Sequence, residues 1–284
     1  MVNHKKKQNN QLSRIIDTHT HILPGIDDGA REIENSVAIV RWLSGQGITD
    51  IIATPHYIVE TEYVSIKSAN AKLLKELKAR LKAEGIKAEL YLGNEIYIND
   101  HIGDLIKSKK IAPINDGEYL LVEMSLDDEC PNYEDYFYEL IQNGYKVILA
   151  HPERYAIIQK DYEIARRLYG IGVLLQCNMG SIIGKYGSEA KKVVKKLAKD
   201  KMIFALGSDA HHPGREDYLP VAWKKLSKFY TDEELRQILE LNPAEILKKV
   251  AKKATKKTAK KTAKKPAKKT TKKSTKKSTK STKK

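Results

Sequence analysis

Seven short apolar runs recur along the first 211 residues, with longer amphipathic stretches between them. They are "RIIDTHTH" (14–21), "ITDIIATPH" (48–56), "KAELYLGNEI" (87–96), "EYLLVEMS" (118–125), "YKVILAHPE" (145–153), "VLLQCN" (173–178) and "MIFALGSDAH" (202–211). Unbroken runs of this kind are typical of strands that are buried on both faces of a parallel sheet. The pattern therefore predicts seven parallel strands.

Five stretches between these runs have the spacing of amphipathic helices, at 32–44, 64–84, 133–143, 162–169 and 189–200. Glycines follow them in "GQG", "EGI", "NGY" and "GIG", where helices commonly end. Two further helix starts are predicted at "TDEEL" and "NPAEI" from their capping residue and proline. Strands that alternate with helices predict an α/β fold around a parallel sheet, which is either open or closed into a barrel.

The apolar pattern stops near residue 250, where the chain becomes a repeat of paired lysines and small residues. Such a segment cannot bury a core and repels itself, so we expect residues 250–284 to be disordered. Its positive charge predicts binding to polyanions, either nucleic acid or an anionic surface. Because it has no aromatic residue for base stacking, we expect this binding to be non-specific. The alternative is a solvated appendage with no dedicated partner.

The net charge of +16 belongs to this tail. Of the 52 basic residues, 19 are lysines from Lys248 onward, which leaves 33 basic against 36 acidic residues, a net charge of −3. We therefore expect a flexible N-terminus at 1–13, a nearly neutral folded domain at 14–249 and a basic tail at 250–284.

Cysteine usage and hydropathy predict a cytoplasmic protein. Cys130 and Cys177 are far apart and form no disulfide framework, so we expect structural thiols in a reducing compartment. No apolar run approaches the roughly 18 residues of a membrane-spanning helix, and the basic N-terminus lacks the apolar stretch of a secretory signal.

Histidines and carboxylates gather at the ends of the predicted strands. The candidates are His19, His21, His56, Glu95, Glu123, His151, Asp209 and His211, which include five of the eight histidines. The carboxyl ends of parallel strands form the active-site face of α/β folds. A lone histidine there is usually structural, and an acidic pair such as Asp27 and Asp28 is usually a turn. The inference therefore depends on the whole set.

A histidine and carboxylate cluster without cysteine suits Zn²⁺, Mn²⁺ or Fe²⁺. The candidates exceed six, so two or three ions are expected, with a carboxylate bridging some of them. Such centres usually catalyse hydrolysis. His19 and His21 lie at positions i and i+2 of one strand, so they point to the same face, as a shared ion requires.

The ordered motifs "DTHTH", "TPHY", "GNEIY", "LVEMS", "HPERY" and "SDAHH" resemble the PHP (polymerase and histidinol phosphatase) superfamily over about residues 14–248. Within it, the chain resembles the metal-dependent protein-tyrosine phosphatases of bacterial capsule and exopolysaccharide clusters. The resemblance implies a distorted (β/α)₇ barrel of TIM-like type and a trinuclear site. The implied cofactor is Mn²⁺, with Zn²⁺, Fe²⁺ or Mg²⁺ as alternatives.

The resemblance also implies how the ligands divide among three ions. They are His19, His21 and Asp209 for the first; Glu95, Glu123 and His151 for the second, with Glu95 bridging to the first; and Asp28, His56 and His211 for the third. Asp28 is preferred to Asp27 because it directly precedes the glycine of "IDDGA". Arg154 matches a phosphate-binding arginine, and Arg215 is the candidate for a second.

These features predict hydrolysis of phosphotyrosine by a metal-bound hydroxide, on a substrate implied to be a bacterial tyrosine kinase. A cysteine-based phosphatase is excluded because neither cysteine is followed by a C-x₅-R loop. The alternatives are a small-molecule phosphatase of the histidinol-phosphate type, a nuclease, or a polyanion-binding protein with a structural metal. The alternative for Arg154 is a surface ion pair with Glu153.

Overall fold

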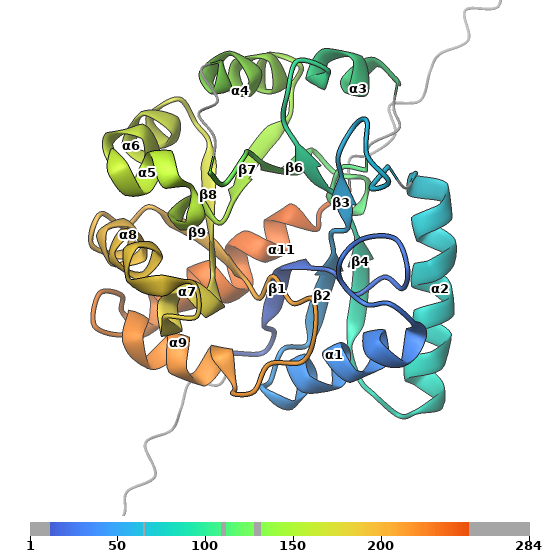
Figure 1. Ribbon diagram of the computed structural model, residues 1–284. Coiled ribbons are helices and arrows are strands. Elements are labelled where there is room, and N and C mark those ends of the chain that lie inside the picture. The colour runs from blue at the N-terminus through green and yellow to red at the C-terminus, as the bar shows by residue number, and fades with distance from the viewer. Residues whose placement is uncertain (1–11, 65, 109–111, 128–131, 250–284) are drawn as a thin grey trace, which may run out of the picture. The chain divides into compact units, whose positions relative to one another are not determined.

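The computed structural model describes residues 12–64, 66–108, 112–127 and 132–249 (Figure 1). The predicted lysine-rich tail, residues 1–11 of the predicted N-terminal segment, and Cys130 lie outside these ranges. At the start of the described chain, Leu12 packs against the core, and Ser13 Oγ donates a hydrogen bond to Glu240 Oε1 at 2.5 Å.

Every strand pair within the two sheets is parallel, which confirms an α/β fold with a parallel sheet. The first sheet has the order β1 (Ile16–Thr20), β2 (Asp50–Ala53), β4 (Glu89–Leu92). The second has the order β3 (His56–Tyr57), β5 (Glu95–Tyr97), β6 (Tyr119–Glu123), β7 (Lys146–Ala150), β8 (Leu174–Asn178), β9 (Ile203–Gly207).

Two of the predicted strands are interrupted, and these interruptions divide the strands into two sheets. Run 48–56 becomes β2 and β3 because Pro55 has no N–H to donate to a ladder. Run 87–96 becomes β4 and β5 with Gly93 between them. The sheets also meet where the chain just after β9 lies beside the end of β1, through a parallel bridge between Thr20 and Ala210. The first and last predicted strands are therefore neighbours.

The five predicted helices are present with ends shifted by three residues at most, and they lie outside the strands (Figure 1). They are α1 (Ile33–Gly45), α2 (Lys67–Ala83), α4 (Tyr133–Gln142), α6 (Glu163–Gly170) and α8 (Gly187–Lys199). Four further helices were not predicted, and three of them have seven residues or fewer, which give too little periodicity. These are α3 (Ile102–Ser108), α5 (Ala156–Lys160), α7 (Met179–Ile183) and α9 (Tyr218–Leu226), with 3₁₀ turns η1 (Ile114–Asp116) and η2 (Pro152–Arg154).

The predicted helix start at "NPAEI" agrees with the first residue of α11, but the break that separate helices would need before it is absent. α10 (Asp232–Arg236) begins at a capping box between Thr231 and Glu234, as "TDEEL" predicts. It then runs through a π-helical turn, η3 (Gln237–Leu241), directly into α11 (Asn242–Ile246). Asn242 has helical dihedral angles, and its Nδ2 donates to Phe204 O at 2.8 Å, so it anchors a continuous helix rather than beginning one.

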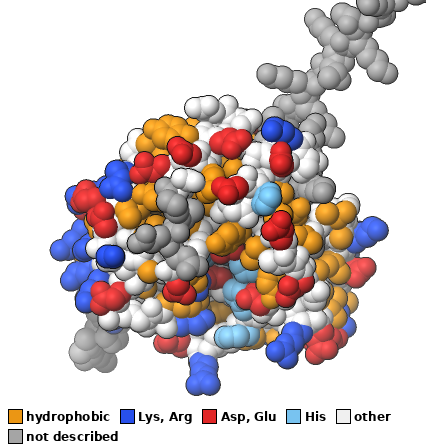
Figure 2. Space-filling view, turned by 45° about the horizontal axis from the view of Figure 1, so that its top comes forward, with side chains coloured by type: hydrophobic (Ala, Val, Ile, Leu, Met, Phe, Trp, Pro, Cys, Tyr) orange, Lys and Arg blue, Asp and Glu red, His pale blue; other side chains and the backbone are white. Residues whose placement is uncertain are grey.

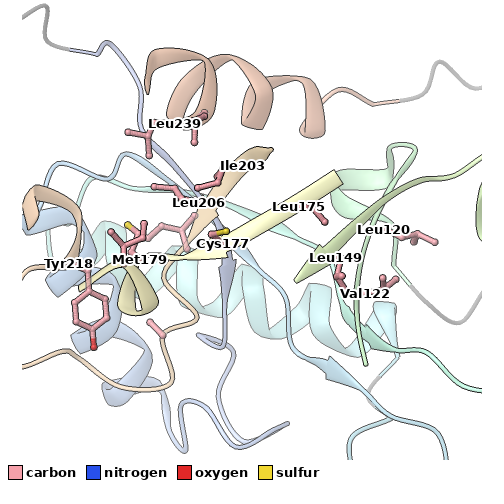
Figure 3. Packing of buried hydrophobic residues seen from close by; sticks show 14 of the residues in the cluster. Leu120, Val122, Leu149, Leu175, Cys177, Met179, Ile203, Leu206, Tyr218 and Leu239 are labelled. Atoms are coloured by element: carbon pink, nitrogen blue, oxygen red, sulfur yellow. The ribbon is translucent and has the colours of Figure 1, made fainter. Parts of the chain in front are cut away.

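Alternate residues of each strand point to opposite faces of the sheets, where they contribute to two separate apolar clusters. The larger lies between strands and helices, and Figure 3 shows Leu149 of β7, Leu175 of β8 and Leu206 of β9 in it. The smaller contains Ile16, Ile52, Leu121, Ile148 and Ala205 from five strands, together with Ile246 of α11. Because this inner face is apolar over the bodies of the strands, its polar side chains collect at the carboxyl ends.

Cys177 is a buried free thiol in the larger cluster, as expected for a structural cysteine, and burial raises its pKa. No helix within the described ranges has the length and hydropathy to cross a membrane.

Candidate metal centre

The nine predicted ligands lie together on one side of the strands, and Figure 2 shows histidine and acidic side chains in a hollow of this face. Most lie at or just after the carboxyl end of a strand, whereas His56 and Glu95 begin the short strands β3 and β5 and Asp28 lies in the loop after β1. The deepest are His19, His21, Glu95, Glu123, His151 and Asp209, which are all buried. The side chains of His56 and His211 are 14% and 25% exposed, and that of Asp28 is 52% exposed. The cluster therefore runs from the interior to solvent.

Glu95, at the start of β5, lies at the middle of the cluster. Its Oε2 lies 3.0 Å from His19 Nε2, 3.2 Å from His21 Nε2 and 3.2 Å from His56 Nδ1. Its Oε1 lies 2.9 Å from His151 Nε2. One carboxylate thus faces four imidazoles, which is the environment expected of a ligand that bridges two ions.

The contact between His19 and His21 requires positive charge between them. His19 Nδ1 donates to Gln176 Oε1 at 3.0 Å, and His21 Nδ1 donates to Asp27 Oδ2 at 2.9 Å. In neutral rings this leaves both Nε2 atoms as acceptors, and they face each other at 3.1 Å. Two lone pairs at this distance repel unless a proton or a metal ion lies between them, and nitrogen ligands bind such metal ions at about 2.0–2.1 Å. The donor set therefore fits a divalent ion.

Asp209 completes this group, as predicted. Its Oδ1 lies 3.6 Å from His19 Nε2 and 3.4 Å from His21 Nε2. Asp209 and His151 both have positive φ, at 52° and 34°, in the left-handed region that non-glycine residues seldom adopt. Strained residues of this kind are common at functional sites, where the backbone is bent to aim a side chain.

His56 lies between two ligand groups rather than in one. Its Nδ1 lies 2.7 Å from Glu123 Oε1 and 3.2 Å from Glu95 Oε2, so these three residues form one candidate site. Its Nε2 lies 3.5 Å from Asp28 Oδ1, within the group of His21, Asp28, His56 and His211. The ligand assignment implied by the resemblance placed His56 only with Asp28 and His211, on the third ion.

The adjacent aspartates have different positions. Asp27 is buried, and besides His21 it accepts hydrogen bonds from the backbone N–H groups of Gly29 and His56, at 3.0 and 3.3 Å. Asp28 instead points its Oδ1 to within 3.1 Å of His211 Nε2. The prediction of Asp28 as the ligand agrees with this geometry, and Asp27 has the place of a carboxylate that orients a ligating histidine.

The charges of the cluster favour a cation. Burial opposes the charged form of His56, but the neighbouring Glu95 and Glu123 carboxylates raise its pKa to about 9. The hydrogen bond from His211 lowers the pKa of Asp28 to about 2. Burial also opposes the charged forms of His19 and His21, but the neighbouring carboxylates raise the pKa of both, so in the chain without metal, protons on these three histidines offset the negative charge of the carboxylates.

Two polar residues of β8 that the sequence analysis did not select link the deepest ligands. Gln176 accepts from His19 and donates through Nε2 to Asn178 Oδ1 at 3.0 Å. Asn178 Nδ2 donates to Asp209 Oδ2 at 2.7 Å. The signal was available, because "VLLQCN" ends a buried strand with two polar amides on one face.

Arg154 pairs with Asp209 rather than with Glu153. Its Nη1 donates to Asp209 Oδ2 at 2.7 Å, and its guanidinium lies 4.5 Å from the ring centre of Tyr186. Glu153 is buried and instead accepts from the backbone N–H of Asn178 at 2.9 Å. The Arg154 side chain stays 23% exposed, so it faces the hollow and solvent.

Arg215 lies on the connection between β9 and α9 and is exposed. Within the described ranges no hydrogen bond or ion pair joins it to the cluster or to Arg154. His101 and His212, which the sequence analysis left out, also lie outside the cluster.

A family model described as "Capsular polysaccharide synthesis, CpsB/CapC" matches residues 15–248. The chain belongs to the CpsB/CapC family. This confirms the resemblance drawn from the motifs, and the matched residues span every predicted ligand of the cluster.

Named relatives of this CpsB/CapC chain are tyrosine-protein phosphatases. It is 32% identical over 227 residues to the putative tyrosine-protein phosphatase CapC of Staphylococcus aureus, covering 80% of this chain and 86% of the relative. It is 34% identical over 202 residues to the tyrosine-protein phosphatase YwqE of Bacillus subtilis, covering 70% and 78%.

Solved structures agree with this assignment. One from a study of YwqE of Bacillus subtilis and CpsB of Streptococcus pneumoniae, described as metal-dependent tyrosine phosphatases, matches with a TM-score of 0.74 and 30% identity. It covers 82% of this chain and 94% of the other. A phosphotriesterase homology protein of Escherichia coli matches with a TM-score of 0.55 at 12% identity, over 84% and 99% of the two chains, which shows a shared fold alone.

Proposed function

We propose that this chain is a metal-dependent protein-tyrosine phosphatase. The observation that carries the proposal is Glu95 Oε2, a buried carboxylate oxygen within 3.2 Å of three histidine nitrogens. Arg154 lies beside this cluster on Asp209, in position to bind a phosphate. The phosphatase names of relatives with 32% and 34% identity support the same activity.

The chain's own residues bind and orient the phosphate. Arg154 directs a planar guanidinium into the hollow, where its fork suits two phosphate oxygens. Asp209 and the ring of Tyr186 fix the plane of that guanidinium. When bound, divalent ions supply a nucleophilic oxygen from water and withdraw charge from the phosphate oxygens.

The leaving group favours an aryl ester. The phenol of tyrosine has a pKa of about 10, so its oxygen leaves with less proton donation than an alkoxide needs. A metal site can therefore hydrolyse an aryl phosphate without a strong general acid. This favours phosphotyrosine over phosphoserine.

The proposal also covers the metal ions, the type of barrel and the substrate. We assign the nine clustered residues to three ions, with Mn²⁺ as the metal and Glu95 as the bridge. We assign the fold to a distorted (β/α)₇ barrel, in which β2 with β3, and β4 with β5, each form one interrupted strand. The proposed substrate is a bacterial tyrosine kinase that controls capsule or exopolysaccharide synthesis, and the family description supports the link to capsular polysaccharide synthesis. The cytoplasmic location and polyanion binding by the tail stay predictions.

The test is hydrolysis of a phosphotyrosine peptide with and without Mn²⁺, beside histidinol phosphate and single-stranded DNA. We expect metal-dependent hydrolysis of the peptide, lost with chelator and in His151→Ala. Arg154→Lys should keep Mn²⁺ binding but lower kcat/KM about 10- to 100-fold, because lysine keeps the charge and loses the fork. Preferred hydrolysis of histidinol phosphate or DNA by the metal-loaded protein would overturn the proposal.

A further inference from the structure

A line of lysines leads away from Arg154 along the turn between α7 and α8. Tyr186 lies between Arg154 and Lys185, whose Nζ is 5.0 Å from the centre of its ring. Lys185 also lies 5.5 Å from the ring centre of Tyr218 on α9. Cations and aromatic rings thus alternate from Arg154 through Tyr186 and Lys185 to the buried ring of Tyr218.

The line continues on the other side of this turn. Lys191 of α8 lies against Gly184, where an added Cβ would be 3.7 Å from its Nζ. Lys225 of α9 donates to the carbonyl oxygens of Ile182 and Ile183, at 3.2 and 3.1 Å. The last turn of α7 is therefore bordered by lysines from both neighbouring helices.

These lysines border a groove of about 330 Å³ between α7, α8 and α9. Ile182, Val194, Leu226 and Phe229 form its apolar floor. Lys191, Lys195, Lys225 and Lys228 surround the floor. With Lys185, these four lysines are called the basic track below.

The basic track has no acidic partners of its own. Among the described residues, none of its five lysines forms an ion pair with a carboxylate, although many lysines elsewhere do. Burial is the main cause that lowers the pKa of Lys225. The positive charges of Lys191 and Lys228 lower it further, and the Glu216 carboxylate acts in the opposite direction. The rest of the domain is slightly acidic, so this concentration of charge is local.

We propose that the basic track binds the acidic polypeptide that carries the phosphotyrosine, with its apolar side chains on the groove floor. This inference rests on the proposed function and adds to it the substrate's chemistry around the phosphorylated residue. The lysines complement carboxylates and further phosphotyrosines, and the apolar floor suits side chains rather than the sugar-phosphate backbone of a nucleic acid. The contacts of Tyr186 with Arg154 and Lys185, and of Lys191 with Gly184 next to Lys185, link the phosphate-binding arginine to this groove.

The test compares two phosphotyrosine peptides of one length, one flanked by glutamates and one by glutamines, with p-nitrophenyl phosphate as a small substrate. The variant is Lys191→Ala/Lys195→Ala/Lys228→Ala, which spares Lys225 because it binds the α7 carbonyls. The control is Lys72→Ala/Lys75→Ala/Lys78→Ala, which removes the same charge from exposed positions of α2. The full chain is used throughout, so the tail is constant.

We expect the track variant to raise KM for the glutamate peptide about fivefold or more, as the loss of several exposed ion pairs predicts. The glutamine peptide and p-nitrophenyl phosphate should stay within about twofold. In the control variant all three substrates should behave as in the unmodified protein. Raising salt from about 0.05 M to about 0.3 M should remove most of the difference between the peptides.

Equal effects of the track and control variants would overturn the inference, because they would show a general field rather than a site. So would an equal rise in KM for p-nitrophenyl phosphate, which would place the lysines in the reaction centre. Loss of single-stranded DNA binding with unchanged peptide KM would identify a nucleic acid as the occupant. Failure of the unmodified protein to hydrolyse any of the three substrates would instead refute the proposed function.

Discussion

Replacing Gln176 with leucine should weaken metal binding without removing a ligand. Gln176 is fully buried and joins His19 Nδ1 to Asn178 Oδ1 by two hydrogen bonds of 3.0 Å. Leucine has a similar volume but neither accepts nor donates. The exchange therefore leaves a ring nitrogen and an amide oxygen buried without partners.

The magnitude follows from these two contacts. Each buried polar atom without a partner costs about 1–3 kcal/mol, so the metal-free protein should lose about 2–6 kcal/mol of stability. His19 is then free to rotate or to change tautomer, which removes Nε2 from its place beside His21. Loss of such an orienting partner typically lowers metal affinity about 10- to 100-fold, or about 1.4–2.8 kcal/mol.

The assay is calorimetric titration with Mn²⁺, with thermal unfolding of the metal-free protein measured beside it. Gln176→Glu is the matched variant, because its carboxylate still accepts from His19 Nδ1 while losing the donor to Asn178. We expect its Mn²⁺ affinity to stay above that of Gln176→Leu. Unchanged affinity in a folded leucine variant, or equal loss in both variants, would refute the role of this hydrogen bond.

Four other predictions follow, two of which concern His56. Mn²⁺ binding at pH 7 should release at least one proton, because His56 has a pKa of about 9 without metal. Calorimetric titration in two buffers of different ionisation enthalpy counts the released protons, and a count of zero would contradict this prediction. In the metal-free protein the same shift contributes stability below pH 6.5 that is lost as the pH rises through about 9, which urea unfolding across this range detects. Tyr186→Leu should raise KM for phosphotyrosine several-fold while Tyr186→Phe should not, since only the ring orients Arg154; equal KM values in steady-state kinetics would argue against stacking. Thr231→Ala should cost about 1 kcal/mol by breaking the capping box, with activity unchanged, and a wild-type melting temperature would show that the cap contributes nothing.

The sequence determined the elements and the identity of the cluster because both depend on local order. Unbroken apolar runs can only be buried strands when helices of amphipathic spacing lie between them, and parallel strands bring their carboxyl ends to one edge. This is why His19, Glu95 and His151 could be grouped although more than 130 residues separate the first from the last. Where periodicity was short or a helix continued through a proline, as at Asn242, local signals failed.

Only the tertiary structure decided which atoms meet. The position of Asp28 before the glycine favoured it as the ligand, but only the structure shows that Asp27 turns inward and bonds to His21. The amides of Gln176 and Asn178 acquire their role because β8 lies beside β9 and directs them at ligands from β1 and the end of β9. Arg154 pairs with Asp209 instead of the adjacent Glu153 for the same reason: contacts across a folded sheet depend on backbone direction, which sequence neighbours do not share.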